Sequence, residues 1–100
     1  MLLSEAARAK HATEIESIHN YYEHLVFDAI HAVIGEQKPD QGYIADLACI
    51  ALNNLPPRYV RYDVDMAFYQ SPDERDEMLD KVSIAVQKAF AMINSKRRED

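Results

Sequence analysis

The sequence has few of the residues that interrupt helices or cross-link chains. Its 100 residues include two glycines, four prolines and one cysteine, Cys49, and no tryptophan. So little glycine disfavours a loop-rich or all-β fold and favours helices, and it leaves no glycine-rich phosphate loop. A lone thiol cannot form an internal disulfide, which suits a reducing compartment. Because Cys49 lies in an apolar segment, we interpret it as a small buried hydrophobe and not as a nucleophile.

Long apolar runs and an excess of positive charge are absent as well. No run approaches the roughly 20 residues that span a bilayer, and the polar pair Ser4-Glu5 follows Met1-Leu2-Leu3 directly, so we expect no signal peptide. The formal net charge is −6. This negative charge disfavours binding to duplex DNA, because the affinity of proteins for duplex DNA comes mainly from lysine and arginine side chains at phosphates. We therefore expect a cytoplasmic protein that neither inserts into membranes nor binds duplex DNA.

What is present suffices for one small folded domain. Apolar residues make up 48% of the chain and charged residues 28%, which is ordinary for a globular protein of this size. We assign residues 1–100 to a single domain with a modest core. Within it, we expect the alanine-rich residues 1–12 to be a frayed helical extension and residues 95–100 to be a flexible basic tail.

Apolar residues at three- and four-residue steps predict a long first helix. It starts at Ser4 or near Thr13 and runs to about Ile34, where Gly35 is suited to cap it and Pro39 marks its end. This spacing places the apolar side chains on one stripe of the helix. The stripe consists of Ile15, Ile18, Tyr22, Leu25, Val26, Ala29 and Val33.

Two further helices carry clear boundary signals. A short apolar helix is predicted over about Tyr43 to Asn54, with Asp40 as a possible N-cap and a proline pair at 56–57 that stops it. A third helix begins at Ser71-Pro72-Asp73-Glu74, which places a serine cap, an N1 proline and a glutamate in register. We expect it to end near Asn94. Its apolar stripe consists of Met78, Val82, Ala85, Val86, Ala89 and Ile93.

The segment from Tyr59 to Phe68 alternates in polarity, which predicts a half-buried strand. Val60, Tyr62, Val64 and Met66 fall on one side, and Arg61, Asp63 and Asp65 on the other. Such a strand has no partner elsewhere in the sequence, and an unpaired strand exposes backbone donors and acceptors. A second copy of the chain would supply the partner, so we expect a homodimer. The alternative is an irregular segment that lies along its own helices.

These elements predict a mostly α fold: a long N-terminal helix, a short buried helix, one strand that pairs across a dimer, and a C-terminal helix. His24, Asp28 and His31 share a helix face, which is either a solvated surface or, less simply, a zinc site. The spacing of His19, Glu23 and His24 does not match the inverted zinc-hydrolase motif. No nucleophilic triad is recognisable. We therefore expect no enzyme activity, no metal and no cofactor.

The residues between 52 and 63 are the best candidates for a binding site. Arginine pairs with phosphate through two nitrogens and stacks on purines, tyrosine stacks as well, and asparagine can read a base edge. The candidates are Asn53, Asn54, Arg58, Tyr59, Arg61, Tyr62 and Asp63. The structural alternative is that Asn53 or Asn54 caps the helix, the prolines set a turn, and Arg61 pairs with Asp63 or Asp65.

The same region resembles a known family. The stretch from Asp46 to Val60, with the sequence DLACIALNNLPPRYV, is similar to the core signature of the late competence development protein ComFB family. In that family an Asp begins a short helix that leads through Leu-Asn to a proline and then to Tyr-Val. The stretch from Asn20 to Val26, NYYEHLV, resembles the family's first helix. The likeness covers roughly residues 18 to 65.

The resemblance implies a small, helical, dimeric protein named for a bacterial DNA-uptake operon. Some members of the family are receptors for cyclic dinucleotides such as cyclic di-GMP or cyclic di-AMP. Among the candidate residues, the two arginines would hold phosphates, the two tyrosines would stack, and the asparagines or Asp63 would read the base. Other members bind zinc through cysteines placed before the Asp of the second helix, but residues 36–45 contain none.

Two other functions remain open at this stage. The chain could be a ligand-free interaction module that uses its helices to bind a downstream protein partner. It could also be a metal-dependent enzyme built on His24, Asp28 and His31, which is the reading the sequence favours least. A two-fold symmetric cyclic dinucleotide suits a two-fold dimer, which is why we favour the receptor.

Overall fold

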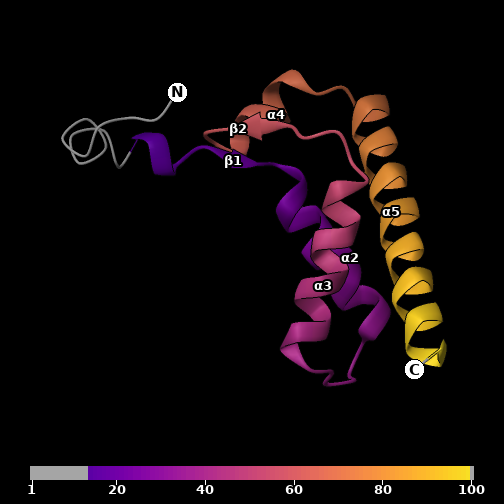
Figure 1. Ribbon diagram of the computed structural model, residues 1–100. Helices are drawn as coiled ribbons and strands as arrows, with labels where there is room; N and C mark the ends of the chain where they lie inside the picture. Colours follow the sequence, from indigo (N-terminus) through magenta and orange to yellow (C-terminus); the bar gives the residue numbers. More distant parts are fainter. Residues whose placement is uncertain (1–13, 100) are drawn as a thin grey trace.

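The fold consists of three packed helices and a smaller lobe at one end (Figure 1). The structure is a computed structural model that describes residues 14–99, with side chains to residue 96. The mostly helical architecture confirms the predicted fold class. In chain order the elements are β1 (His19–Asn20), α2 (Tyr22–Ile34), α3 (Gln41–Asn53), β2 (Tyr59–Val60), α4 (Val64–Tyr69) and α5 (Pro72–Glu99).

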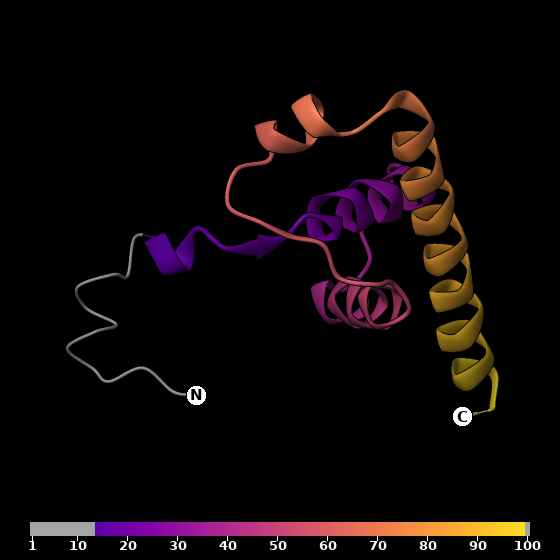
Figure 2. The same ribbon diagram turned by 90° about the horizontal axis from the view of Figure 1, so that it is seen from above.

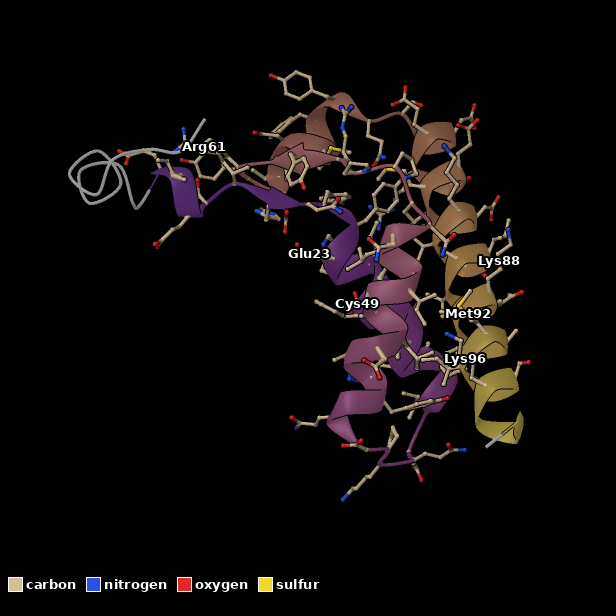
Figure 3. All side chains as sticks on the ribbon, viewed as in Figure 1. Glu23, Cys49, Arg61, Lys88, Met92 and Lys96 are labelled. Atoms are coloured by element: carbon tan, nitrogen blue, oxygen red, sulfur yellow. The ribbon has the colours of Figure 1, made fainter. Side chains whose placement is uncertain are left out.

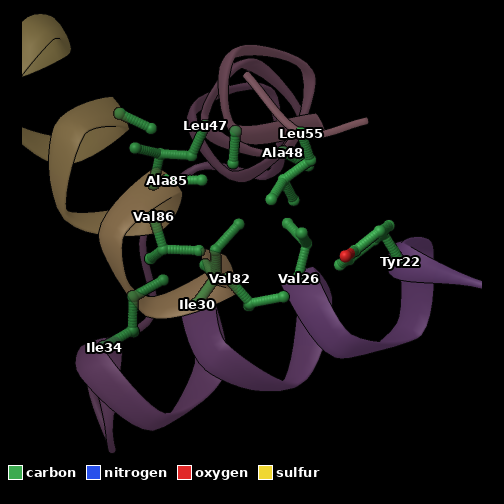
Figure 4. Packing of buried hydrophobic residues seen from close by; sticks show 12 residues of the cluster. Tyr22, Val26, Ile30, Ile34, Leu47, Ala48, Leu55, Val82, Ala85 and Val86 are labelled. Carbon is green, nitrogen blue, oxygen red and sulfur yellow. The ribbon is translucent and has the colours of Figure 1, made fainter. Parts of the chain in front are cut away.

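Helices α2, α3 and α5 share one apolar core. The long helix α5 lies on one side of the other two (Figure 2), and all three helix pairs are in contact. Figure 4 shows how side chains from the three helices meet between them. The buried set is Tyr22, Val26, Ile30, Ile34, Leu47, Ala48, Ala51, Leu55, Val82, Ala85, Val86 and Ala89. The four-residue steps within this set on α2 and α5 are those of a helix with one buried face.

The first helix begins later than predicted. Within the described residues, a short helical turn at 14–16 is followed by the extended pair β1, and α2 begins only at Tyr22. The predicted starts at Ser4 and Thr13 lie outside the described residues. The side chain of Asn20 explains the break, because its Oδ1 accepts from the Tyr22 N–H at 3.2 Å and so bonds the first turn of α2 from outside the helix.

The buried stripe of α2 is also shifted from the predicted one. Val33 is 59% exposed, whereas Ile30 and Ile34 are buried with Val26. Ile15 and Ile18 precede the helix and are exposed. They cannot belong to its stripe, because the periodicity that seemed to join them to it does not continue through an extended segment.

The strand predicted over residues 59–68 is shorter than expected and has a partner within its own chain. Only β2 is extended, and it pairs antiparallel with β1 of the same chain, His19 with Val60 and Asn20 with Tyr59. The rest of the segment turns into the helix α4, which buries Met66 and leaves Val64 exposed. The backbone groups that the prediction left unpaired thus find partners within the chain, and the argument from an orphan strand no longer requires a second copy.

The predicted helix boundaries at caps are confirmed. Asp40 accepts from the Gly42 N–H at 3.2 Å, and Ser71 Oγ accepts from the Glu74 N–H at 3.2 Å. Gly35 adopts a φ of 64°, which favours glycine, and its N–H donates to the His31 carbonyl. Helix α5 runs through residue 99, past the predicted end near position 94. None of the helices within residues 14–99 is both long and apolar enough to cross a lipid bilayer.

Candidate functional site

Both backbone polar groups of Arg58 are hydrogen-bonded to the residues just before α2. Its N–H donates to Asn20 Oδ1 at 3.0 Å, and its carbonyl accepts from the Tyr21 N–H at 2.7 Å. The proline pair before it ends α3 and supplies no N–H of its own. The main chain at Arg58 is therefore tied to the start of α2, while its exposed side chain forms no ion pair within the described residues.

Arg58 and Tyr59 border a surface pocket of about 490 Å³ between β2 and α4. Tyr59 is 67% exposed and Tyr69, on the other side of the pocket, is 82% exposed. The lining residues are Pro57, Arg58, Tyr59, Val60, Asp65, Met66 and Tyr69. The pocket thus combines one guanidinium, two aromatic rings and one carboxylate.

Arg61, Tyr62 and Asp63 belong to a different cluster, on the side of the lobe that faces β1. Arg61 Nε donates to Ser17 Oγ at 3.2 Å and Nη2 donates to the Tyr62 hydroxyl at 3.1 Å, with the guanidinium 5.0 Å from the centroid of the Tyr62 ring. Figure 3 shows Arg61 at the far end of the molecule from Lys88. The structural alternative that pairs Arg61 with Asp63 or Asp65 is wrong, because the ion pair found within the described residues joins Asp63 to His19 and Arg61 takes part in none.

His19 joins β1 to the loop before α4. Its Nε2 lies 2.5 Å from Asp63 Oδ1, and its Nδ1 lies 2.8 Å from the Ser17 carbonyl oxygen. A carboxylate and a carbonyl both accept hydrogen bonds, so each ring nitrogen must donate, and only the imidazolium does so. Consistently, the bond to Asp63 raises the pKa of His19 above its ordinary value, and the Ser17 carbonyl and the charge of Glu23 add to the rise.

The two asparagines lie apart from both clusters, at the end of α3. Asn54 caps this helix and its Nδ2 donates to the Ile50 carbonyl at 2.8 Å, which confirms the structural alternative for this residue. Asn53 is the last residue of the helix and is exposed. The seven predicted site residues therefore occupy three places, and of these only Arg58 and Tyr59 share a pocket.

The family signature spans both the lobe and the core. The sequence model of the late competence development protein ComFB family matches residues 19–97, from β1 into the last turn of α5. The chain belongs to the ComFB family. The comparison with curated proteins and the comparison with solved structures each find no significant match. Membership confirms the resemblance noted in the sequence and indicates a competence-related regulatory protein.

The zinc site that the family resemblance implies for some ComFB proteins does not fit the side chains of this chain. Residues 36–45 contain no cysteine, and within the described residues no three His, Cys, Asp or Glu side chains are grouped to hold a metal ion. Of the proposed surface ligands, His31 Nδ1 bonds to the Phe27 carbonyl oxygen at 2.7 Å and His24 packs edge-on against Tyr21.

The prediction that Cys49 is a small buried hydrophobe is wrong, because Cys49 is exposed in this ComFB chain. Helix α3 buries Leu47, Ala48 and Ala51, and position 49 therefore faces away from the core. Its free thiol lies on the outer surface of α3 (Figure 3).

Sequence reasoning missed Tyr69 and His19 as neighbours of the candidate residues. Tyr69 follows Asp65 by four positions, and residues four apart share a face once α4 is recognised as a helix. The alternating pattern concealed that signal. No sequence signal places His19 next to Asp63, because 44 positions separate them.

Proposed function

We propose that this ComFB-family chain is a dimeric regulator that binds a cyclic dinucleotide, such as cyclic di-GMP or cyclic di-AMP, and that it is not an enzyme. The observation that carries the proposal is the pocket of about 490 Å³ at which the unpaired guanidinium of Arg58 meets the exposed rings of Tyr59 and Tyr69. We name it the nucleotide pocket. Its volume lies within the range of about 300–1,000 Å³ that is usual for small-molecule sites.

The lining of the nucleotide pocket matches the two parts of a nucleotide. Arg58 would bind a phosphate through two nitrogens, and a purine would stack on Tyr59 or Tyr69, a contact worth about 1–3 kcal/mol per base. Asp65 is placed to accept from a base N–H. Of the other predicted ligands, Arg61 and Tyr62 bond to each other and Asp63 pairs with His19, so we assign them a supporting role.

The proposal of a dimer is supported by exposed apolar side chains and not by strand pairing, since the strands pair within one chain. Helix α4 exposes Val64, Phe68 and Tyr69 next to the nucleotide pocket, and exposed apolar groups gathered in this way are typical of contact surfaces. A two-fold dimer would present two copies of Arg58 to a ligand that itself has two phosphates and two bases. The overall charge of −6 opposes a dianion, so these arginines must dominate locally.

Titration calorimetry with cyclic di-GMP and cyclic di-AMP tests the site. Arg58→Ala should weaken binding by about 10- to 100-fold, because it removes charge-assisted hydrogen bonds. Arg75→Ala is the matched control, since it removes an arginine from α5 outside the nucleotide pocket. Arg61→Ala should have a smaller effect than Arg58→Ala. Equal affinity of Arg58→Ala and the wild-type chain, or no binding of either nucleotide, would contradict the proposal.

A second candidate, a ligand-free interaction module, is favoured by the groove between α2 and α5. This groove has a volume of about 470 Å³ and a mainly apolar lining that includes Leu25, Ala29, Val33 and Leu79. A downstream protein could lay an amphipathic helix in it. A thermal-shift panel of cyclic and linear dinucleotides separates the two functions, because a receptor gains stability with its ligand and an interaction module does not.

A further inference from the structure

A second pocket lies on the other side of Arg58 and Met66, and nothing in the proposed function uses it. It holds about 300 Å³ and is bounded by the proline pair, by Gln70 and by the first turns of α5. Arg58, Met66 and Pro57 also border the nucleotide pocket, so the two spaces share a wall. Its lining residues are Tyr22, Pro56, Pro57, Arg58, Met66, Gln70, Glu74, Glu77, Met78 and Lys81.

Helix α5 contributes an entire face to this pocket. Glu74, Glu77, Met78 and Lys81 all line it, and steps of three, four and seven residues place side chains on one side of a helix. The same face continues into the core at Val82 and Ala85. The polar residues of the pocket thus stand on a helix that the core holds in place.

The hydroxyl group of Tyr22 is the polar group that the core presents to this pocket. Tyr22 is only 3% exposed, and no hydrogen bond of its hydroxyl occurs within the described residues. In that part of the chain no fully buried side-chain oxygen lacks a partner, so the hydroxyl must retain accessible surface, and the pocket that Tyr22 lines provides it. Burial raises the pKa of Tyr22, while the charge of Arg58 lowers it, so the hydroxyl stays protonated and can donate.

The charged groups of the pocket are of both signs and are free to bind. Arg58 and Lys81 are opposed by Glu74 and Glu77, and none of the four forms an ion pair within residues 14–96. Their formal charges cancel, which disfavours a dianion such as a phosphate diester pair. A ligand with one positive and one negative end would satisfy both sets.

We propose that this pocket binds a small zwitterion, a free α-amino acid. Its carboxylate would accept from Arg58 and from the Tyr22 hydroxyl, and its ammonium group would donate to Glu77 and Glu74. Because Arg58 also borders the nucleotide pocket, its guanidinium would hold either this carboxylate or a phosphate at one time. The side chain of the ligand would lie against the flexible thioethers of Met66 and Met78, which adapt to different shapes. A volume of about 300 Å³ is at the small end for ligand sites, which suits an amino acid and not a dinucleotide.

Three probes with the same isobutyl side chain test whether both charges are required. We would titrate the full chain by calorimetry with L-leucine, with 4-methylpentanoate, which lacks the ammonium group, and with 3-methylbutylamine, which lacks the carboxylate. A thermal-shift panel of the twenty standard L-amino acids would run beside them. If another amino acid gives the largest shift, it would replace leucine, together with its analogue that lacks the ammonium group and its analogue that lacks the carboxylate. We expect the amino acid to bind at least about tenfold more tightly than either analogue, one charge-assisted contact being worth that much.

Two variants locate the site. Tyr22→Phe keeps the apolar ring in the core and removes only the hydroxyl, so it should fold and bind the amino acid about tenfold more weakly. Glu77→Gln should have a comparable effect, with Asp80→Asn as its control on the same helix outside the pocket. Circular dichroism would verify the folding of each variant.

The outcomes separate this inference from the proposed function. No shift with any amino acid, equal binding of the single-charge analogues, or unchanged binding by both variants would overturn the zwitterion site. Tighter binding of guanosine or adenosine than of any amino acid would overturn it as well and would make the space a base subsite. The proposed function is tested separately. Tyr22→Phe should leave the affinity for cyclic dinucleotides unchanged, because Tyr22 does not line the nucleotide pocket.

Discussion

The core of α2, α3 and α5 and the lobe of β1, β2 and α4 are held together by different physics. The core buries side chains from three helices, among them Val26, Ile30 and Leu47, which are fully enclosed. The lobe buries Met66 and otherwise depends on directional polar contacts through Asn20 and His19. The two regions therefore differ in role: the core supplies stability, and the lobe presents polar and aromatic groups at the surface.

The largest effect expected from this contrast is in the core. Ile30→Ala should destabilise the protein by about 2–5 kcal/mol, because it removes a fully buried side chain and leaves a cavity. Val33→Ala, one turn along on the exposed face of the same helix, should stay within about 0.5 kcal/mol of wild type. Urea denaturation measures both. Equal losses would mean that Val33 is covered in solution, for example by a second copy.

An intermediate effect is expected where the lobe joins the core. Asn20→Ala removes the oxygen that accepts from the Tyr22 and Arg58 N–H groups, and the loss of these two hydrogen bonds should cost about 1–2 kcal/mol. Hydrogen exchange at Arg58 should accelerate more than exchange in α3. Asn53→Ala, at an exposed asparagine, serves as the control, and an equal loss from it would show that the contact contributes nothing specific.

The smallest effect concerns the His19–Asp63 pair, which is partly exposed and screened by solvent. Because the folded state raises the pKa of His19 above 6.5, the pair stabilises the fold fully below pH 6.5 and loses this contribution as the pH rises through the higher folded pKa. An NMR titration of the His19 ring should show the elevated pKa. Asp63→Asn should bring that pKa down, whereas Asp65→Asn should leave it in place. An unaltered titration in Asp63→Asn would contradict the ion pair.

The sequence predicts the helices of the core better than the lobe, and the reason lies in the range of the interactions. The caps at Asp40, Ser71 and Gly35 act within four residues of themselves, so local pattern suffices to find them. Pairing of β1 with β2 joins residues about 40 positions apart through two residues on each side, which is too short to leave a periodic signal. Alternation over 59–68 then mimicked a strand where a six-residue helix forms.

The candidate site divides along the same line. Arg58 and Tyr59 follow the proline pair directly and border the same pocket. Arg61 and Asp63 are close to them in sequence, but they contact Ser17 and His19 and do not line that pocket. The apolar spacing predicts Tyr22 as a core residue, and it carries no sign that the residue lines a pocket with side chains of α5.

The choice of asparagine at position 20 follows from the two bonds that its one oxygen accepts. Serine would end a carbon short of Arg58, and glutamine would carry the amide a carbon too far for the neighbouring Tyr22 N–H. Aspartate preserves the reach and the acceptor, and it adds a negative charge beside an arginine. In a saturation library at this codon, survivors should therefore need both an acceptor oxygen and the reach of asparagine, with aspartate the first replacement tolerated.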